Sequence, residues 1–163
     1  IGLPNAGKSS LLSVITNANP KIANYRFTTL TPNLGGASYD DKEITLADIP
    51  GLVEGAHEGV GLGIQFLKHI ERCKTLIHLI DITNEDLENT YQQVKNELER
   101  YSGKLLKKKV IIVLNKTDLL DESEVKKIMK IFSKDKDSEV ITLSTLDKNS
   151  ISKIKAKLLS YVS

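Results

Sequence analysis

The chain has 163 residues, of which 40% are hydrophobic and 27% are charged, and this composition fits one globular domain with a full core. Its only cysteine, Cys73, excludes an internal disulfide, and no apolar run approaches the roughly 18 residues of a membrane-spanning helix. We therefore expect a reducing, cytoplasmic setting and no membrane span, with Cys73 as a helix residue rather than a nucleophile.

The net charge of +2 is unevenly distributed along the chain. Residues 1–103 hold 13 acidic and nine basic side chains, whereas residues 104–163 hold 14 lysines and eight acidic side chains. A basic region can face nucleic acid, but no aromatic residues alternate with these lysines as a stacking platform would require. We interpret the lysines as solvated positions on helix surfaces.

The first half of the chain shows short alternating strand and helix patterns. In chain order, we expect a helix over 9–17, an irregular polar segment over 21–33, strands over 37–39 and 43–48 with a hairpin turn at 40–42, a mobile loop over 51–63, and a helix over 64–72. The loop is expected to be mobile because it holds five of the ten glycines.

The second half repeats a strand–helix alternation with longer elements. In chain order, we expect a strand over 75–81, a helix over 85–101 capped by Asn84 or Thr83, a strand over 109–115, a helix over 123–132, a strand over 140–144, and a helix over 150–162. The strands are nearly continuous apolar runs separated by helices. This pattern favours an α/β fold with a parallel sheet that is covered on both faces.

Residues 2–9 read Gly-Leu-Pro-Asn-Ala-Gly-Lys-Ser and match the phosphate-binding loop pattern G-x-x-x-x-G-K-[ST]. Gly2 and Gly7 allow backbone N–H groups to turn inward around phosphate oxygens. Lys8 supplies positive charge for the β- and γ-phosphates, and Ser9 offers a hydroxyl to Mg²⁺. The expected nucleotide contacts are Gly2, Leu3, Pro4, Asn5, Ala6, Gly7, Lys8, Ser9 and Ser10.

A second motif, Asp48-Ile49-Pro50-Gly51, ends a predicted strand, at the edge where open α/β sheets bind ligands. Asp48 can hold Mg²⁺ through water, and Gly51 can bring its N–H close to a γ-phosphate. Upstream, Thr29 is the first candidate to complete the Mg²⁺ shell and Thr28 is the second. The expected nucleotide contacts of these two segments are Phe27, Thr28, Thr29, Asp48, Ile49, Pro50 and Gly51.

A third motif, Asn115-Lys116-Thr117-Asp118, follows the strand over 109–115. The Asp118 carboxylate can accept hydrogen bonds from N1–H and the exocyclic amine of guanine together, a donor pair that adenine lacks. Asn115 can tie this loop to the phosphate loop, and the Lys116 stem can lie over the purine ring. The expected base contacts are Asn115, Lys116, Asp118, Leu119, Ser144, Thr145 and Leu146, the last three through backbone N–H groups near the guanine O6.

These motifs, in this order, are similar to those of the Ras-like GTPases. A longer stretch is more specific: DIPGLVEGAHEGVGLG at 48–63 and FLKHIERC at 66–73, with YRFTTL at 25–30 and PN at 32–33. Together they resemble the Obg (CgtA-type) GTPase family over essentially the whole chain. Two positions depart from that family's usual pattern, because Thr145 stands where alanine is usual and Arg26 where proline is common.

The resemblance implies a three-layer P-loop GTPase fold, whose mostly parallel six-stranded sheet has one antiparallel edge strand and helices on both faces. Residues 1–163 would form one G domain with a truncated first strand, without the glycine-rich N-terminal domain and the C-terminal domain of the family. It also implies a slow, Mg²⁺-dependent switch that binds GTP and GDP and hydrolyses GTP. Such a switch would act in the cytoplasm in assembly of the large ribosomal subunit, and we expect the isolated domain to be monomeric.

The sequence also raises the question of how GTP would be hydrolysed. Leu52 stands where Ras-type enzymes carry a glutamine that orients the attacking water. Asn5 matches an asparagine that helps to hold K⁺ in potassium-activated relatives, so K⁺ is a candidate second cation. His57 could position water, or it could only pack or contact a partner. With His57, the candidate catalytic groups are Lys8, Thr29 and Gly51.

Two other interpretations stay open from the sequence. The chain could be a nucleotide-gated module that docks on ribosomal RNA or protein with negligible turnover. It could also be an ATPase of the YchF-like type, although Asp118 argues against adenine. Measured GTP hydrolysis distinguishes the docking module from a GTPase. A comparison of GDP and ADP binding distinguishes the ATPase from a GTPase.

Overall fold

The computed structural model describes residues 1–3, 5–16, 21–22, 33–39, 42–48, 71, 73–101, 104–134 and 138–161. At its centre lies a parallel sheet in the order β4-β5-β6, made of β4 (Thr75–Asp81), β5 (Lys109–Asn115) and β6 (Glu139–Leu143). The strands at 75–81 and 109–115 have the bounds expected from their apolar runs. The third strand begins and ends one residue earlier than expected.

A second sheet is antiparallel throughout and has the order β1-β2-β3. Its strands are β1 (Lys21–Ile22), β2 (Asn33–Tyr39) and β3 (Lys42–Asp48). The expectation of an irregular segment over 21–33 was therefore wrong at both of its ends. β2 also begins four residues before the predicted 37–39. Gly35 lies close to the end of α1, where a Cβ would lie 2.1 Å from Cγ2 of Thr16 and 2.9 Å from Cδ1 of Leu12.

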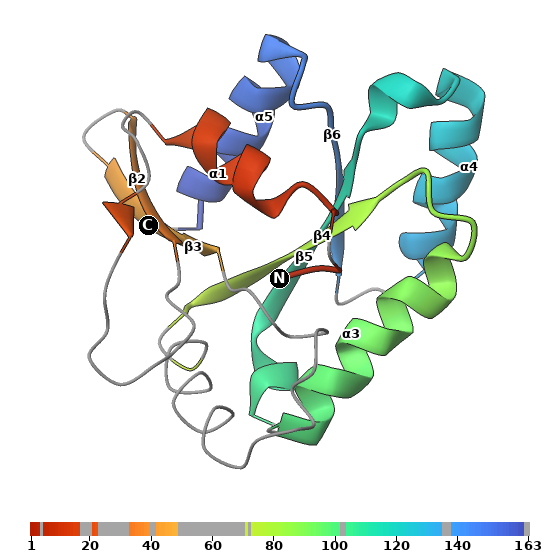
Figure 1. Ribbon diagram of the computed structural model, residues 1–163, viewed down its shortest axis with the longest axis horizontal. Coiled ribbons are helices and arrows are strands. Elements are labelled where there is room, and N and C mark those ends of the chain that lie inside the picture. Colours follow the sequence, from red (N-terminus) through yellow and green to blue (C-terminus); the bar gives the residue numbers. More distant parts are fainter. Residues whose placement is uncertain are drawn as a thin grey trace.

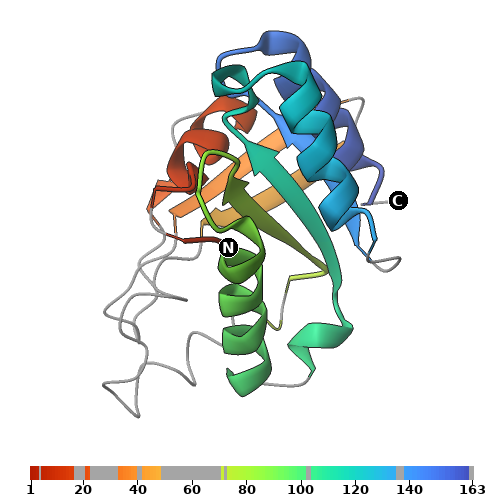
Figure 2. The ribbon, with the colours of Figure 1, turned by 90° about the vertical axis from the view of Figure 1, so that its right-hand side faces the viewer.

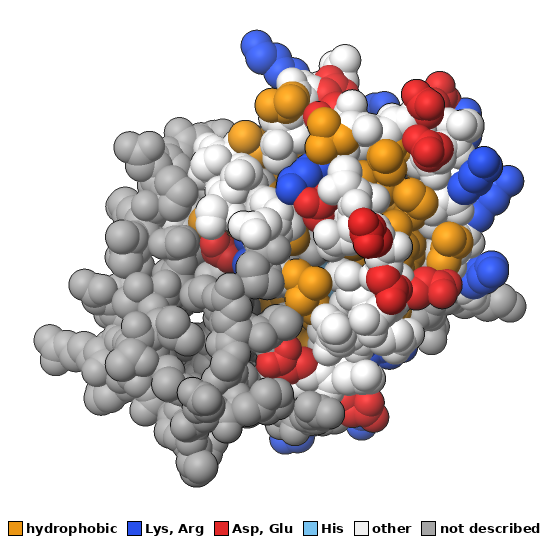
Figure 3. Space-filling model, turned by 45° about the vertical axis from the view of Figure 1, so that its right-hand side comes forward, with side chains coloured by type: hydrophobic (Ala, Val, Ile, Leu, Met, Phe, Trp, Pro, Cys, Tyr) orange, Lys and Arg blue, Asp and Glu red, His pale blue; other side chains and the backbone are white. Residues whose placement is uncertain are grey.

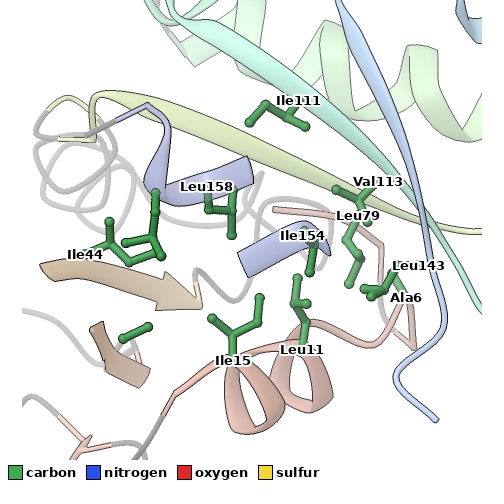
Figure 4. Close-up of a cluster of buried hydrophobic side chains, with 12 residues drawn as sticks. Ala6, Leu11, Ile15, Ile44, Leu79, Ile111, Val113, Leu143, Ile154 and Leu158 are labelled. Atoms are coloured by element: carbon green, nitrogen blue, oxygen red, sulfur yellow. The ribbon is translucent and has the colours of Figure 1, made fainter. Parts of the chain in front are cut away.

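Helices cover both faces of the parallel sheet, as expected (Figures 1 and 2). The helices are α1 (Lys8–Ile15), α3 (Leu87–Tyr101), α4 (Glu122–Phe132) and α5 (Lys148–Leu159), with short 3₁₀ turns η1 (Leu105–Lys107) and η2 (Thr117–Leu119). Alternate residues of β5 point to opposite layers. Ile111 and Val113 pack with α1 and α5, as Figure 4 shows, whereas Ile112 and Leu114 pack with Phe132 of α4.

Three of these helices begin at aspartates that cap their first turn. Asp86 accepts a hydrogen bond from the N–H of Asn89 at 3.0 Å, so α3 is capped there and not by Asn84 or Thr83. Asp121 and Glu124 form a capping box on α4, and Asp147 accepts from the N–H groups of Asn149 and Ser150 on α5. These caps explain why the observed helix starts differ from the predicted ones by one or two residues.

Among the described residues the strands pair as two three-stranded sheets, so the single six-stranded sheet implied by the resemblance is not confirmed. Ile1 donates its N–H to the oxygen of Ile77 and accepts from the N–H of Leu79, both at 2.9 Å, which is the pattern of a parallel bridge to β4. The two-residue β1 also pairs antiparallel with β2, so antiparallel pairing involves more than the one edge strand that was expected.

Cys73 was expected to be a helix residue. It lies just before β4 and outside any described helix.

The surface of the described part mixes apolar and charged side chains. On the face shown in Figure 3, acidic and basic side chains both lie among apolar ones. Two leucines, Leu119 and Leu146, are exposed to 61% and 82% of their full surface. Among the described helices, none combines the length and apolar character needed to cross a bilayer.

One polar ring is buried in the layer between the parallel sheet and α3. His78 of β4 is 2% exposed and stacks on Tyr91, with ring centroids 5.5 Å apart. Its Nε2 has no hydrogen-bond partner in the part of the chain that the structure describes. Burial lowers the pKa of His78 to about 3, because the charged imidazolium would lose its hydration.

We predict that His78 makes the fold sensitive to mild acid. In the unfolded chain the imidazole takes up a proton below pH 6.5, whereas the folded form resists this until about pH 3. Stability is therefore full above pH 6.5 and falls by about 1.4 kcal/mol per pH unit below it. Urea unfolding at neutral pH and in mild acid measures this loss. The free energy of unfolding should fall less in acid for His78→Leu, which keeps the other two histidines, than for the unchanged chain. Equal pH dependence of the two proteins would contradict this account.

Candidate functional site

The loop over residues 2–9 connects Ile1 to α1 and requires glycine at two positions. Gly2 has φ 156° and Gly7 has φ 96°, and Asn5 also has positive φ, at 64°. A Cβ on Gly2 would lie 2.4 Å from the carbonyl oxygen of Leu79 on β4. The glycines therefore let the loop lie directly against the end of the parallel sheet.

Asn115, the last residue of β5, ties this loop to the loop that follows β5. Its Nδ2 donates to the carbonyl oxygen of Ala6 at 2.9 Å, and the side chain is 1% exposed. Gly7 makes room for it, because a Cβ there would lie 2.5 Å from the same Nδ2. The link between the two loops is thus present, as the sequence predicted.

Lys8 and the start of α1 bring positive charge to the loop. The Lys8 ammonium donates to the carbonyl oxygens of Gly2 at 2.8 Å and Leu3 at 3.0 Å, so its side chain folds back over the loop. The residue before α1 is Gly7, which has no side chain to cap the first turn. The first N–H groups of α1 therefore have no side-chain cap, which suits an anion at this end of the helix.

Ser9 and Asp48 meet beside this loop, although 39 positions separate them in the sequence. The Ser9 hydroxyl donates to Oδ2 of Asp48 at 2.9 Å. Asp48, at the end of β3, is 8% exposed, and its Oδ1 has no hydrogen-bond partner among the described residues. A hydroxyl beside a buried carboxylate oxygen fits the hard oxygen ligands that Mg²⁺ prefers.

Ser9 and Asp48 are not part of a larger metal-ligating cluster in the part of the chain that the structure describes. Within the described ranges, no group of three or more histidine, cysteine, aspartate or glutamate side chains is arranged to hold a metal ion. Mg²⁺ commonly uses one or two carboxylates together with substrate phosphates and water. The residues present therefore suit a cation that is shared with a phosphate ligand rather than one held by the protein alone.

The loops after β5 and β6 form a second polar cluster. Asp118 lies in η2 and is exposed, and its Oδ1 accepts from the Ser144 hydroxyl at 2.7 Å. The same hydroxyl accepts from the N–H of Leu146 at 3.2 Å. Thr117 anchors η2 by donating to the carbonyl oxygen of Leu143 at 3.1 Å. One oxygen of Asp118 is thus fixed by protein, and this orients the carboxylate.

Lys116 is held by residues that the sequence did not reveal. It has positive φ, at 65°, and its ammonium pairs with Oδ2 of Asp81 at the end of β4. Thr83 donates to Oδ1 of Asp81 through its N–H at 3.0 Å and through its hydroxyl at 2.6 Å. Burial acts to raise the pKa of Asp81, but the hydrogen bonds from Lys116 and Thr83 outweigh it and keep that pKa below its usual value.

The sequence did contain one signal that Asp81 belongs to the site, namely its position at the end of a strand. It ends an apolar strand of the parallel sheet, as Asn115 does, and the two residues are in register across β4 and β5. Polar residues at such strand ends meet at one edge of the sheet. That rule would have predicted that Asp81 lies beside the loop after β5, which bears Lys116 and Asp118.

Several predicted site residues lie outside the described residues. They are Pro4, Phe27, Thr28, Thr29, Ile49, Pro50, Gly51, Leu52 and His57. The predicted helix over 64–72 and the glycine-rich loop over 51–63 fall there too, apart from Glu71. The described site therefore comprises the loop over 2–9 apart from Pro4, Ser9 with Asp48, and the loops after β4, β5 and β6.

The fold is that of the P-loop GTPases. The G domain of the T. maritima FeoB iron transporter matches with a TM-score of 0.69 at 23% identity, over 99% of this chain and 95% of that one. An Era variant of Aquifex aeolicus bound to GDP·AlF4⁻ matches with a TM-score of 0.74 at 25% identity, over 99% of this chain and 55% of that one.

The chain belongs to the family of 50S ribosome-binding GTPases, whose model matches residues 1–116. The resemblance to Obg is also confirmed, because GTPase Obg of Pelagibacter ubique (strain HTCC1062) is 83% identical over 163 residues. That match covers 100% of this chain and 50% of that protein, so the chain spans half the length of this relative.

We predict that Gly7→Ala destabilises the fold, whereas Gly36→Ala does not. Gly7 has positive φ and no space for a Cβ, so alanine would strain the backbone and push Asn115 away from Ala6. We expect a loss of about 2 kcal/mol or more. Gly36 of β2 is exposed, with nothing within 4 Å of a Cβ, so its change should stay within about 0.5 kcal/mol. Urea unfolding measures both, and similar losses in the two variants would contradict the prediction.

Proposed function

We propose that the site binds guanine nucleotides and hydrolyses GTP as a Mg²⁺-dependent molecular switch. The observation that carries this proposal is the hydrogen bond from Asn115 to Ala6, which joins the phosphate loop to the loop that bears Asp118. A nucleotide has a phosphate end and a base end. The bond fixes the position of the candidate phosphate subsite relative to the candidate base subsite.

The proposed phosphate subsite is the loop over 2–10. Gly2, Leu3, Pro4, Asn5, Ala6, Gly7, Lys8, Ser9 and Ser10 are its proposed contacts. The positive φ of Gly7 and the uncapped start of α1 support it, because both favour inward-facing N–H groups. Lys8 would exchange its bonds to Gly2 and Leu3 for phosphate oxygens, which are stronger, charged acceptors.

The proposed base subsite is the cluster around Asp118. Ser144 occupies Oδ1 of Asp118 and so orients the carboxylate, which accepts the paired donors of guanine. Asn115, Lys116, Leu119, Ser144, Thr145 and Leu146 are the other proposed contacts. Adenine offers no matching donor pair, so this cluster favours a GTPase over an ATPase.

Asp118→Asn tests the base assignment. Two hydrogen bonds to a charged acceptor contribute about 1.5–3 kcal/mol each, so the affinity for mant-GDP should fall about 100-fold or more. The affinity for mant-XDP should rise instead, because the amide can donate to the extra carbonyl of xanthine. Asp121→Asn, an exposed cap of α4, is the matched control and should leave both affinities near the wild-type values. Retained GDP preference in Asp118→Asn would refute the assignment.

Mg²⁺ is the proposed cofactor, with Ser9, Asp48 and Thr29 as its candidate protein ligands. The contact between Ser9 and Asp48 and the unpartnered Oδ1 of Asp48 support this choice. When bound, Mg²⁺ neutralises charge on the β- and γ-phosphates. The protein's own part is to hold the Ser9 hydroxyl and the Asp48 carboxylate together at the phosphate loop.

We predict that Asp48→Asn weakens the response of nucleotide binding to Mg²⁺. Affinity for a non-hydrolysable mant-GTP analogue is measured with Mg²⁺ and with EDTA. The gain caused by Mg²⁺ should fall about 10-fold in the variant, because an amide is a weaker partner for a hydrated cation. In EDTA the two proteins should bind alike. An undiminished gain would remove Asp48 from the cation site.

The hydrolytic step would rely on groups other than a switch glutamine, since Leu52 cannot orient water. Lys8, Thr29, Gly51 and His57 are the proposed catalytic candidates. Asn5 is proposed to help hold K⁺ as a second cation, supported by its place in the phosphate loop and its positive φ. Faster GTP turnover in K⁺ than in Na⁺ at matched ionic strength supports that role, and equal turnover removes it.

The family also suggests where this chain acts and with which partner. We propose that residues 1–163 form one monomeric G domain that acts in the cytoplasm on the large ribosomal subunit during its assembly. The description of the family as 50S ribosome-binding GTPases supports the ribosomal partner. We further propose that the two sheets belong to one six-stranded sheet. The bonds of Ile1 to β4 and the packing of Ala47 of β3 against the core cluster that contains Ile1 support that arrangement.

A further inference from the structure

We propose that Asp81 is a positioning residue for guanine specificity, which acts by holding the Lys116 ammonium away from Asp118. This inference rests on the proposed guanine nucleotide site. It assigns a role to a strand-end carboxylate that touches neither the phosphate loop nor Asp118 in the described contacts. Asp81 would act through Lys116 and would not itself contact the base.

The position of Asp81 is fixed from several sides. It is 8% exposed and lies in register with Asn115. The N–H of the next residue, Ile82, donates to the backbone carbonyl oxygen of Asn115 at 3.0 Å. Both hydrogen bonds from Thr83 go to Oδ1, which leaves Oδ2 for Lys116. The carboxylate therefore presents one oxygen, in one direction, to the lysine.

Lys116 has a second carboxylate close to it in the chain. Only Thr117 separates it from Asp118, and Thr117 is anchored to Leu143, so both residues are confined to one short, fixed turn. A lysine ammonium is a mobile point charge on a flexible stem. Without Asp81, the exposed Asp118 carboxylate is the nearest alternative partner along the chain.

An ion pair between Lys116 and Asp118 would compete with guanine. Ser144 already occupies Oδ1 of Asp118, so the base depends on the remaining acceptor sites of that carboxylate. A lysine at those sites would have to be displaced each time a nucleotide binds. By pairing with Lys116, Asp81 keeps the Asp118 acceptors available. It also directs the lysine stem along the loop after β5 that bears Asp118.

A double-mutant cycle tests this coupling. Mant-GDP affinity is measured for the wild-type chain, Asp81→Asn, Lys116→Met and the double variant. Asp81→Asn should weaken binding about 10-fold in the wild-type background and less than about 2-fold in the Lys116→Met background, where no ammonium remains to compete. Glu85→Gln removes an exposed negative charge from the same connecting segment and serves as the matched control.

Salt dependence gives a readout that a purely structural role would not move. High salt weakens a pair between Lys116 and Asp118, so the ratio of wild-type to Asp81→Asn affinity should shrink as salt is raised. Equal losses in both Lys116 backgrounds, or a ratio that salt does not change, would overturn the proposal. If Asp81→Asn does not fold, Thr83→Val, which loosens the same carboxylate, takes its place in the cycle.

The outcomes separate this inference from the proposed function. A wild-type chain that binds neither GDP nor GTP would refute the guanine nucleotide site itself. A wild-type chain that binds GDP tightly, with no coupling between positions 81 and 116, would refute only the role of Asp81.

Discussion

The hydrogen bond from Asn115 to Ala6 is the contact on which the candidate site depends. It is buried, it spans 109 positions of sequence, and it connects the end of a core strand to the middle of the phosphate loop. It exists because Gly7 has no side chain, since a Cβ there would lie against the Asn115 amide. A buried amide donor without its acceptor would be costly, so the two loops keep one relative position.

The parallel sheet explains why this bond can serve two loops at once. Asp81, Asn115 and Leu143 are in register at the carboxyl ends of β4, β5 and β6. The residues that follow them therefore emerge at one edge, where Lys116 pairs with Asp81 and Ser144 donates to Asp118. Helices on both faces bury the strands, and the polar groups of the candidate site lie at this edge. The arrangement is the one in which open α/β sheets bind ligands.

Much of this was predictable from local sequence, and the rest was not for identifiable reasons. The strands at 75–81 and 109–115 were predicted with their observed bounds, because their nearly continuous apolar runs are too short for a helix and each ends at a polar residue. The loop glycines and the Asn115 link followed from motif chemistry. The start of β2 was missed, because Gly35 and Gly36 weaken a strand signal, and only Gly35 has a close contact with α1. The pair of Asp81 with Lys116 was missed because its partners lie 35 positions apart.

The central claim is that the two linked loops form one guanine nucleotide site. Its most direct test is a fluorescence titration of this chain with mant-GDP and mant-ADP under identical conditions. The account predicts saturable binding of mant-GDP that unlabelled GDP displaces, and mant-ADP binding weaker by a factor of about 100 or more. Tight mant-ADP binding, or equal affinities for the two nucleotides, would contradict it.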